Sequence, residues 1–174
     1  MNSAQHDFGE IKTVSVTAVG NPGQRTFYFS ITSDYGSARI WLEKEELYAI
    51  AMALKQLLYS SAEEQEMGIG LGMDAEIDDS ISEPDLLEFK LGYITLYYDD
   101  SSQRFCFLVF DVREGGGADA KVCFLANAEQ VEALVGEALS VYSAGRPICP
   151  FCHRPIDPGA HVCPSKNGSG HSSG

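Results

Sequence analysis

The sequence predicts an α+β fold made of two pseudo-symmetric βββα repeats, with one antiparallel sheet and both helices on the same face of it. Six short segments are predicted as strands, some of them from an alternation of apolar and polar residues, and two longer segments carry an apolar stripe at helical spacing. The order strand, strand, strand, helix occurs once in each half of the chain. The composition is that of a globular protein, since 44% of the 174 residues are hydrophobic and 21% are charged.

The first repeat contains three predicted strands and a helix. The strands are expected at residues 13–19, 25–32 and 38–42. Pro22 and Gly23 separate the first two and suit the central positions of a type II turn. The helix begins near Glu43, because acidic side chains are favourable at the positive end of a helix dipole. Its apolar stripe consists of Leu47, Ile50, Leu54, Leu57 and Leu58.

The second repeat has the same order, with strands predicted at residues 89–98, 104–113 and 121–125. Residues 105–110 are apolar at every position. This pattern indicates a central strand covered on both sides, or a strand whose second face meets another chain. Asn127 and Gln130 are spaced as a capping box and predict the start of the second helix. Its buried stripe is Val131, Leu134, Val135, Ala138 and Tyr142, and Gly145 and Pro147 end it.

The sheet face away from the helices should carry Tyr28, Trp41, Tyr93 and Tyr97. An aromatic surface of this kind suggests a homodimer or a protein partner. Aromatic residues also favour strands for their own sake, so the pattern fits an ordinary open sheet as well.

The net charge of −13 comes largely from one segment, since residues 60–88 hold ten acidic and no basic side chains. We interpret this segment as a mobile acidic loop. Gly68, Gly70 and Gly72 within it lack the preceding strand and following helix of a phosphate-binding loop. The charge also makes nucleic acid an unlikely partner, because affinity for nucleic acid depends on Lys and Arg at the phosphates.

Near the end of the chain, Cys149, Cys152, His161 and Cys163 have the residue types and spacing of a zinc site. Four protein ligands saturate tetrahedral zinc, so this site would be structural. The competing interpretations are a redox pair of Cys149 and Cys152, and unpaired surface thiols. Cys106 and Cys123 lie in apolar strand segments and are expected to be small buried side chains.

Arg25 and Arg104 occupy corresponding places in the two repeats, each following Gln at the start of the middle strand. Together they would suit an anion or a carboxylate. We favour internal salt bridges, with Asp99 or Asp111 as candidate partners.

The chain contains Gly-Asn-Pro-Gly-Gln-Arg-Thr-Phe from residue 20, Leu-Glu-Lys-Glu from residue 42, and the terminal motif Ala-Gly-Arg-Pro-Ile-Cys-Pro-Phe-Cys followed by Ile-Asp-Pro-Gly-Ala-His-Val-Cys-Pro. Together these segments resemble the bacterial domain-of-unknown-function family 3090, found mainly in actinobacteria and relatives. The resemblance covers residues 7–168 and implies no catalytic residues, because the family has no established activity. Where the motif leads us to expect glycine after the second cysteine, this chain has His153, which is therefore a second candidate for the histidine ligand.

We expect a duplicated domain at residues 1–145, a zinc knuckle at 146–164 and a disordered tail at 165–174. No apolar run reaches the roughly 20 residues of a membrane span, and the start of the chain lacks the pattern of a signal peptide. The sequence thus favours a non-enzymatic cytoplasmic protein that interacts with, or regulates, another protein.

Two other functions stay open at this stage. One is a small-molecule-binding protein or enzyme with a pocket near Arg25 and Arg104. The other is nucleic-acid binding through the knuckle, where Arg146, Arg154 and Lys166 form a local basic group.

Overall fold

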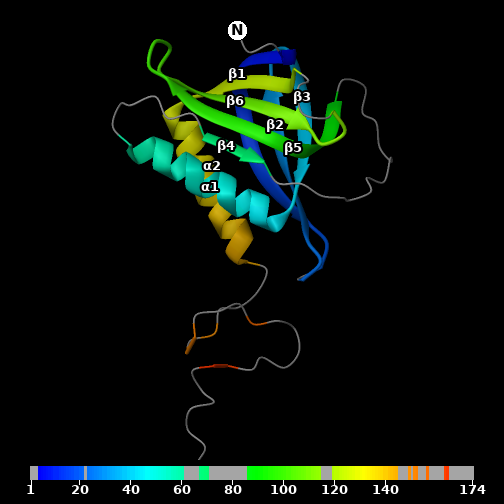
Figure 1. Ribbon diagram of the computed structural model, residues 1–174, viewed down its shortest axis with the longest axis vertical. Coiled ribbons are helices and arrows are strands. Elements are labelled where there is room, and N and C mark those ends of the chain that lie inside the picture. The colour runs from blue at the N-terminus through cyan, green and yellow to red at the C-terminus, as the bar shows by residue number, and fades with distance from the viewer. Residues whose placement is uncertain are drawn as a thin grey trace, which may run out of the picture.

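The computed structural model describes residues 4–21, 23–60, 67–70, 86–114 and 119–144, together with 149, 151, 152, 156, 163 and 164 (Figure 1). Its elements are, in order, β1 (Ala4–Val19), β2 (Thr26–Ser33), β3 (Gly36–Leu42), α1 (Lys44–Tyr59), β4 (Met67–Gly70), β5 (Leu86–Asp99), β6 (Arg104–Asp111), β7 (Ala120–Ala126) and α2 (Ala128–Ser143). Among these elements, no helix is both long and apolar enough to cross a membrane.

The predicted α+β class and the repeated order of elements are confirmed: β1, β2, β3 and α1 correspond to β5, β6, β7 and α2. The expectation of a purely antiparallel sheet is wrong. The strand order is β3-β2-β1-β7-β6-β5-β4, and β3 also pairs with β5, so six strands form a closed ring with β4 beside β5. The β1–β7 and β3–β5 pairs are parallel.

The closure follows from the length of β1 and β5, each of which pairs with a different strand along each of its two halves. Residues 4–10 of β1 pair with β7 and residues 11–19 pair with β2. Residues 86–90 of β5 pair with β3, while residues 91–99 pair with β6. The first strand of each repeat therefore joins both halves of the ring.

A glycine lies near the point where each long strand changes partner. Gly9 adopts φ of +56°, a conformation that L side chains rarely take. A Cβ at Gly92 would come within 2.6 Å of the Val112 Cα, so only glycine fits this close approach of backbone. Both positions coincide with an irregularity in the strand register.

The start of β1 corrects a prediction, because the first strand was expected to begin at residue 13. His6 instead pairs with Val122 of β7. Gln5, His6 and Asp7 are all exposed, so this part of β1 shows no apolar alternation. The backbone of β7 stabilises it, and that pairing leaves no local signal in the sequence.

The acidic segment gives a second correction. Residues 67–70, which we placed in a mobile loop, form β4 and pair antiparallel with residues 93–96 of β5. Gly68 and Gly70 therefore lie in a strand. The remainder of the predicted loop up to β5, including Gly72, lies outside the described residues.

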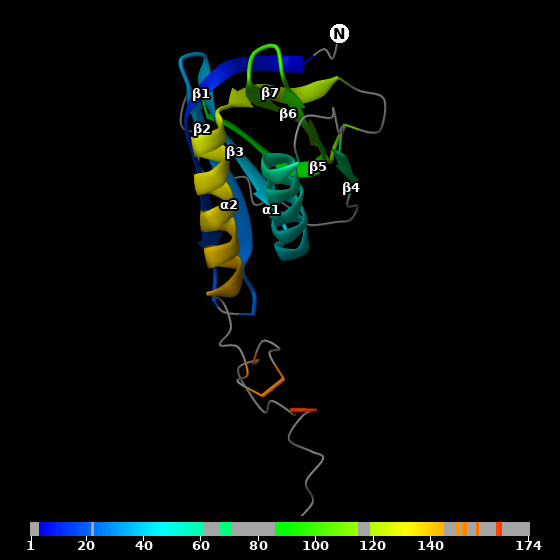
Figure 2. The same cartoon turned by 90° about the vertical axis from the view of Figure 1, so that its left-hand side faces the viewer.

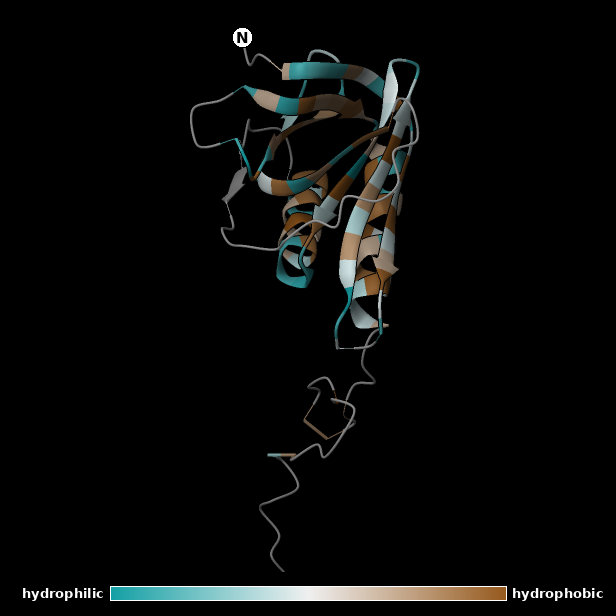
Figure 3. Ribbon diagram, turned by 90° about the vertical axis from the view of Figure 1, so that its right-hand side faces the viewer, coloured by the Kyte–Doolittle hydropathy of each residue, from teal (hydrophilic) through white to brown (hydrophobic). Residues whose placement is uncertain are grey.

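Both helices cover the same side of the strands and lie next to each other (Figures 1 and 2). Their apolar stripes meet one continuous core, and Figure 3 shows hydrophobic residues concentrated where helices and strands face each other. Fully buried core residues include Phe27, Ile31, Ile40, Leu42, Leu47, Ile50, Leu54, Phe89, Leu96 and Val122.

The strand that is apolar on both faces, β6, lies between β5 and β7. Phe105, Phe107 and Val109 enter the main core. Cys106 and Leu108 point to the opposite side, where they form a second buried cluster with Ala120. The prediction of a central strand with two buried faces is confirmed.

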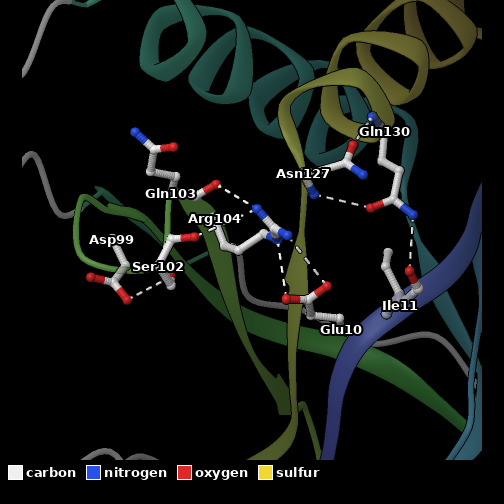
Figure 4. Close-up of polar contacts among 8 residues, drawn as sticks. All are labelled: Glu10, Ile11, Asp99, Ser102, Gln103, Arg104, Asn127 and Gln130. Carbon is white, nitrogen blue, oxygen red and sulfur yellow. Dashed lines mark hydrogen bonds and ion pairs between the residues drawn. The ribbon is translucent and has the colours of Figure 1, made fainter.

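Each helix begins with a capping residue pair that reaches the long strand of the other repeat. In α2 the predicted capping box is confirmed: Gln130 N donates to Asn127 Oδ1 at 2.8 Å, and Asn127 N donates to Gln130 Oε1 at 3.0 Å. Gln130 Nε2 also donates to the carbonyl oxygen of Ile11 in β1 at 2.9 Å (Figure 4). It donates to the carbonyl oxygen of Lys12 as well, at 3.3 Å.

In α1 the corresponding residues are charged. Glu43 N donates to the Glu46 carboxylate at 2.7 Å, and Lys90 Nζ of β5 pairs with the Glu43 carboxylate at 3.1 Å. Burial raises the pKa of Glu46, an effect partly opposed by the Glu43 backbone N–H and by the charge of Lys90. Each repeat thus connects the start of its helix to the long strand of the other repeat. In α2 an uncharged amide makes the connection, and in α1 an ion pair makes it.

Replacing Gln130 tests the link between α2 and β1. Gln130→Ala removes the acceptor for Asn127 N and the donor to Ile11 and Lys12, so it should lower the free energy of unfolding by about 1–2 kcal/mol in urea titrations. Glu132→Ala, an exposed change on the same helix, should cost no more than about 0.5 kcal/mol. Equal losses for both variants would contradict this role of Gln130.

Glu46 should make stability depend on pH. A carboxyl whose pKa is raised by folding binds more protons in the folded state, so its contribution to stability is present at low pH and is lost as pH rises from about 4.5 through the raised value. Glu46→Gln keeps an acceptor for Glu43 N, as Gln130 does in α2, but does not titrate. The free energy of unfolding of this variant minus that of the wild type should therefore increase with pH over that window. A difference that is flat or decreases with pH would refute the assignment.

Candidate metal centre

Three cysteines from the segment after α2 bring their sulfur atoms together. The Sγ atoms of Cys149, Cys152 and Cys163 all lie within 4.8 Å of one another, and those of Cys149 and Cys163 are 3.7 Å apart. Four sulfurs at the usual Zn–S distance of about 2.3 Å stand roughly 3.8 Å apart at the corners of a tetrahedron. Cys149 and Cys163 are buried and Cys152 is half-buried. The cluster therefore has the spacing of a metal site.

The turn that carries Cys149 favours its thiolate. The backbone N–H of Cys152, followed by that of Phe151, donates to the Cys149 sulfur and lowers its pKa to about 6. The thiolate is the form of cysteine that binds metal. The Cys-x-x-Cys spacing thus supplies two sulfurs and also the amides that stabilise the negative charge on the first.

The predicted fourth ligand, His161, lies outside the described residues, as does the alternative His153. Arg146, Arg154 and Lys166, the basic group of the nucleic-acid hypothesis, lie outside them too. The structure thus brings together three of the four predicted ligands.

The other two cysteines, Cys106 and Cys123, belong to the second cluster on β6 and β7. Cys106 is 4% exposed, and both are free thiols. Cys123 and Tyr97 donate hydrogen bonds to Cys106 and lower its pKa to about 7, while the pKa values of the two donors rise. The apolar cluster around Cys106 shields this thiol from solvent. The predicted burial is confirmed for Cys106, whereas Cys123 is half-buried. The sequence gave no indication of the hydrogen bonds.

The two arginines are not brought together. Arg104 forms a two-point ion pair with Glu10 of β1, with Nε–Oε1 at 3.3 Å and Nη2–Oε2 at 3.4 Å (Figure 4). Within the described parts of the chain, no ion pair involves Arg25. It directly precedes Thr26, which pairs with Val19, nine residues along β1 from Glu10. A joint anion site of Arg25 and Arg104 therefore has no support in this geometry.

The carboxylates proposed as partners of the arginines have other contacts. Asp99 accepts hydrogen bonds from Ser101 N and from the hydroxyl groups of Ser101 and Ser102, which lower its pKa. Asp111 accepts from Arg113 N at 2.9 Å. The prediction of a salt bridge was right for Arg104 but named the wrong acid, because Glu10 lies in the part of β1 that the sequence did not reveal as a strand.

The family model for DUF3090, described as a protein of unknown function, matches residues 6–163. The chain belongs to this family. The match extends from β1 through the third cysteine of the cluster, and confirms the resemblance carried by the terminal cysteine motif. Neither curated proteins nor solved structures provide a match.

The described residues of this DUF3090 protein line open hollows at α1 and beside the β2–β3 turn. One, of about 610 Å³, is lined by residues of α1 that include Met52, Lys55 and Tyr59. The other, of about 500 Å³, lies between β1 and the β2–β3 turn and is lined by residues that include His6 and Tyr35. Neither is lined by Arg25 or Arg104, so neither matches the predicted small-molecule pocket.

Proposed function

We propose that this protein is a non-catalytic interaction or regulatory protein whose C-terminal segment folds around one structural zinc ion. Cys149, Cys152 and Cys163 would supply three ligands and His161 the fourth, with His153 as the alternative. The convergence of three sulfurs within 4.8 Å is the observation that carries the proposal. A dithiol redox pair needs only two of them.

The chemistry of this ligand set favours a structural role. Three thiolates and one imidazole fill the four positions of tetrahedral zinc, leaving none for a substrate or an activated water. A knuckle of about 15 residues cannot bury a hydrophobic core, and zinc binding contributes free energy on the order of 10 kcal/mol to the folding of such small units. In this proposal the metal orders the segment that follows α2.

Exposed apolar side chains support the interaction role. Tyr48 and Met52 on α1 are each 40% exposed, and Tyr59 lies further along the same helix with 73% of its surface accessible. The rings of Tyr48 and of Tyr142 of α2 lie 4.9 Å apart in a tilted arrangement, which extends the surface across both helices. Exposed aromatic and methionine side chains grouped on one surface are typical of sites where proteins meet.

Native mass spectrometry of the full chain, before and after treatment with a chelator, tests the metal directly. We expect one zinc ion per chain and its loss in Cys152→Ser. Cys123→Ser, a matched change at a cysteine in the sheet, should retain the metal. His161→Gln and His153→Gln compare the two candidate fourth ligands, and the same spectra report the number of subunits.

Several results would count against the proposal. They are a chain purified under reducing conditions without bound zinc, full zinc occupancy in Cys152→Ser, or turnover of a small molecule that depends on the bound metal. Chelation should also leave the unfolding temperature of the domain formed by the seven strands, α1 and α2 nearly unchanged, because the cysteines follow α2, its last element.

A further inference from the structure

The outer side of α1 carries a row of large, exposed side chains. Tyr48, Met52, Lys55 and Tyr59 are three or four residues apart, so they lie on one side of the helix. Tyr48 and Met52 are each 40% exposed, and Tyr59 is 73% exposed. The buried residues of α1 lie on the opposite side and enter the core. This row, the α1 row, therefore projects away from the core.

The neighbouring row on α2 is shallow. Glu129, Ala133, Gly136 and Ser140 have the same spacing as the residues of the α1 row, and all four are exposed. Alanine, glycine and serine have the smallest side chains. The outer surface of the two helices thus consists of a projecting row on α1 beside a shallow row on α2.

Gly136 lowers the stability of α2 without a visible gain inside the chain. Glycine in the interior of a helix is destabilising relative to alanine, because it loses more backbone freedom on folding. A Cβ at Gly136 would meet no atom within 4 Å, whereas a Cβ at Gly92 would come within 2.6 Å of neighbouring backbone. The described part of the chain thus gives no steric reason for this glycine. Close contact with another molecule would give one.

The charges of the two helices are complementary. α2 contains three glutamates and no Lys or Arg, while Lys55 belongs to the α1 row. Within the part of the chain that the structure describes, neither Lys55 nor Glu132 forms an ion pair. A molecule with the outer surface of α2 would therefore suit α1, and one with the outer surface of α1 would suit α2. A second copy of this chain has both surfaces.

We propose that two copies of this chain form a symmetric dimer through the outer sides of α1 and α2, with α1 of each copy lying over α2 of the other. A two-fold axis parallel to the helices produces this contact twice. An axis across the helices would instead place α2 against α2 and bring the glutamates of both copies together. The inference rests on the proposed interaction role, and it names the partner as a second copy.

Contacts within one chain define the level of each helix relative to the other. The start of α1 lies beside the end of α2, where Lys44 Nζ is 4.7 Å from the centre of the Tyr142 ring and the Tyr48 ring is 4.9 Å from it. The two helices run in roughly opposite directions (Figure 1). A two-fold axis parallel to them leaves these levels unchanged between the copies.

The same levels predict which residues meet across the dimer. Counting equal numbers of residues along both helices from the Tyr142 contact brings Met52 level with Gly136 and Lys55 level with residues 132 and 133. Met52 would therefore pack on Gly136 of the partner subunit, where the absence of a side chain leaves room for it. Lys55 would lie near Glu132 of the partner subunit.

The size of this face predicts a weak dimer. Each helix has 16 residues and is therefore about 24 Å long, and two neighbouring helices are together about 20 Å wide, which gives a face of roughly 500 Å² per copy. A standard interface buries roughly 800 Å² per partner.

The charge of −13 on each copy also opposes association. Ten of the 25 acidic residues lie within residues 60–88, so the rest of the chain holds 15 acids against 12 bases and the repulsion is concentrated in one segment. We therefore expect a dissociation constant in the micromolar range.

Sedimentation velocity of the full chain, from low micromolar to a few hundred micromolar under reducing conditions, tests the dimer. We expect a reversible equilibrium between monomer and dimer that Met52→Gln and Gly136→Gln each weaken at least about tenfold. Gly136→Gln should also retain or raise the unfolding temperature, since glutamine favours a helix more than glycine does. Tyr93→Gln, which removes an aromatic ring with a similar exposure of 38% from the sheet, should leave the dimer unchanged.

A charge exchange tests the predicted pairing between the copies. Lys55→Glu should weaken the dimer several-fold, because it places a carboxylate near Glu132 of the partner subunit. The double variant Lys55→Glu with Glu132→Lys should recover the affinity of the wild type. Circular dichroism establishes that each variant is folded.

The proposal is overturned if the chain is monomeric over the whole concentration range, or if folded Gly136→Gln dimerises like the wild type. It is also overturned if Tyr93→Gln weakens the dimer and Met52→Gln does not, which would place the contact on the sheet, or if the double variant associates no better than Lys55→Glu. A monomer that binds one zinc ion per chain would refute only this inference, because zinc binding is measured separately.

Discussion

The sharing of β1 and β5 between the two halves of the sheet is the constraint on which the other features of the domain depend. Each strand pairs in parallel with the last strand of the other repeat, and then antiparallel with the second strand of its own. Neither repeat can form the closed ring alone, because each supplies three of its six strands. The helix caps reinforce this exchange, because Gln130 bonds to the backbone of β1 and Glu43 pairs with Lys90 of β5.

Local periodicity was sufficient to predict the helices, most strands and the repeat, because each apolar stripe faces a single core. The pairings between strands that are distant in the sequence were harder to predict. The exposed residues Gln5, His6 and Asp7 conceal the start of β1, and a parallel pairing leaves no turn signal between its two strands. The short β4 lies among acidic residues and is held by the edge of β5, so its own sequence does not indicate a strand.

The same distinction applies to clusters of side chains. The cysteine spacing predicted the convergence of Cys149, Cys152 and Cys163, because ligands within one short segment are constrained by local geometry. Tyr28 and Trp41 were predicted to share a face, but Arg39 and Glu88, which contact them, were not recognised with them. The ion pair of Arg39 and Glu88 arises from the parallel β3–β5 pair, which only the closed ring creates. The three cysteines thus come from one short segment, whereas Arg39 and Glu88 are 49 residues apart in the sequence and meet only in the folded sheet.

Amide hydrogen exchange along β1 tests the shared-strand architecture most directly. If the strand joins both halves of the ring, the hydrogen-bonded amides of residues 4–10 should exchange only through the same global unfolding that exposes the amides of residues 11–19. Equal free energies of exchange for the two halves are the predicted result. Exchange of the first half at a much lower free energy, with the second half still protected, would mean that the pairing with β7 is dispensable and would contradict the account.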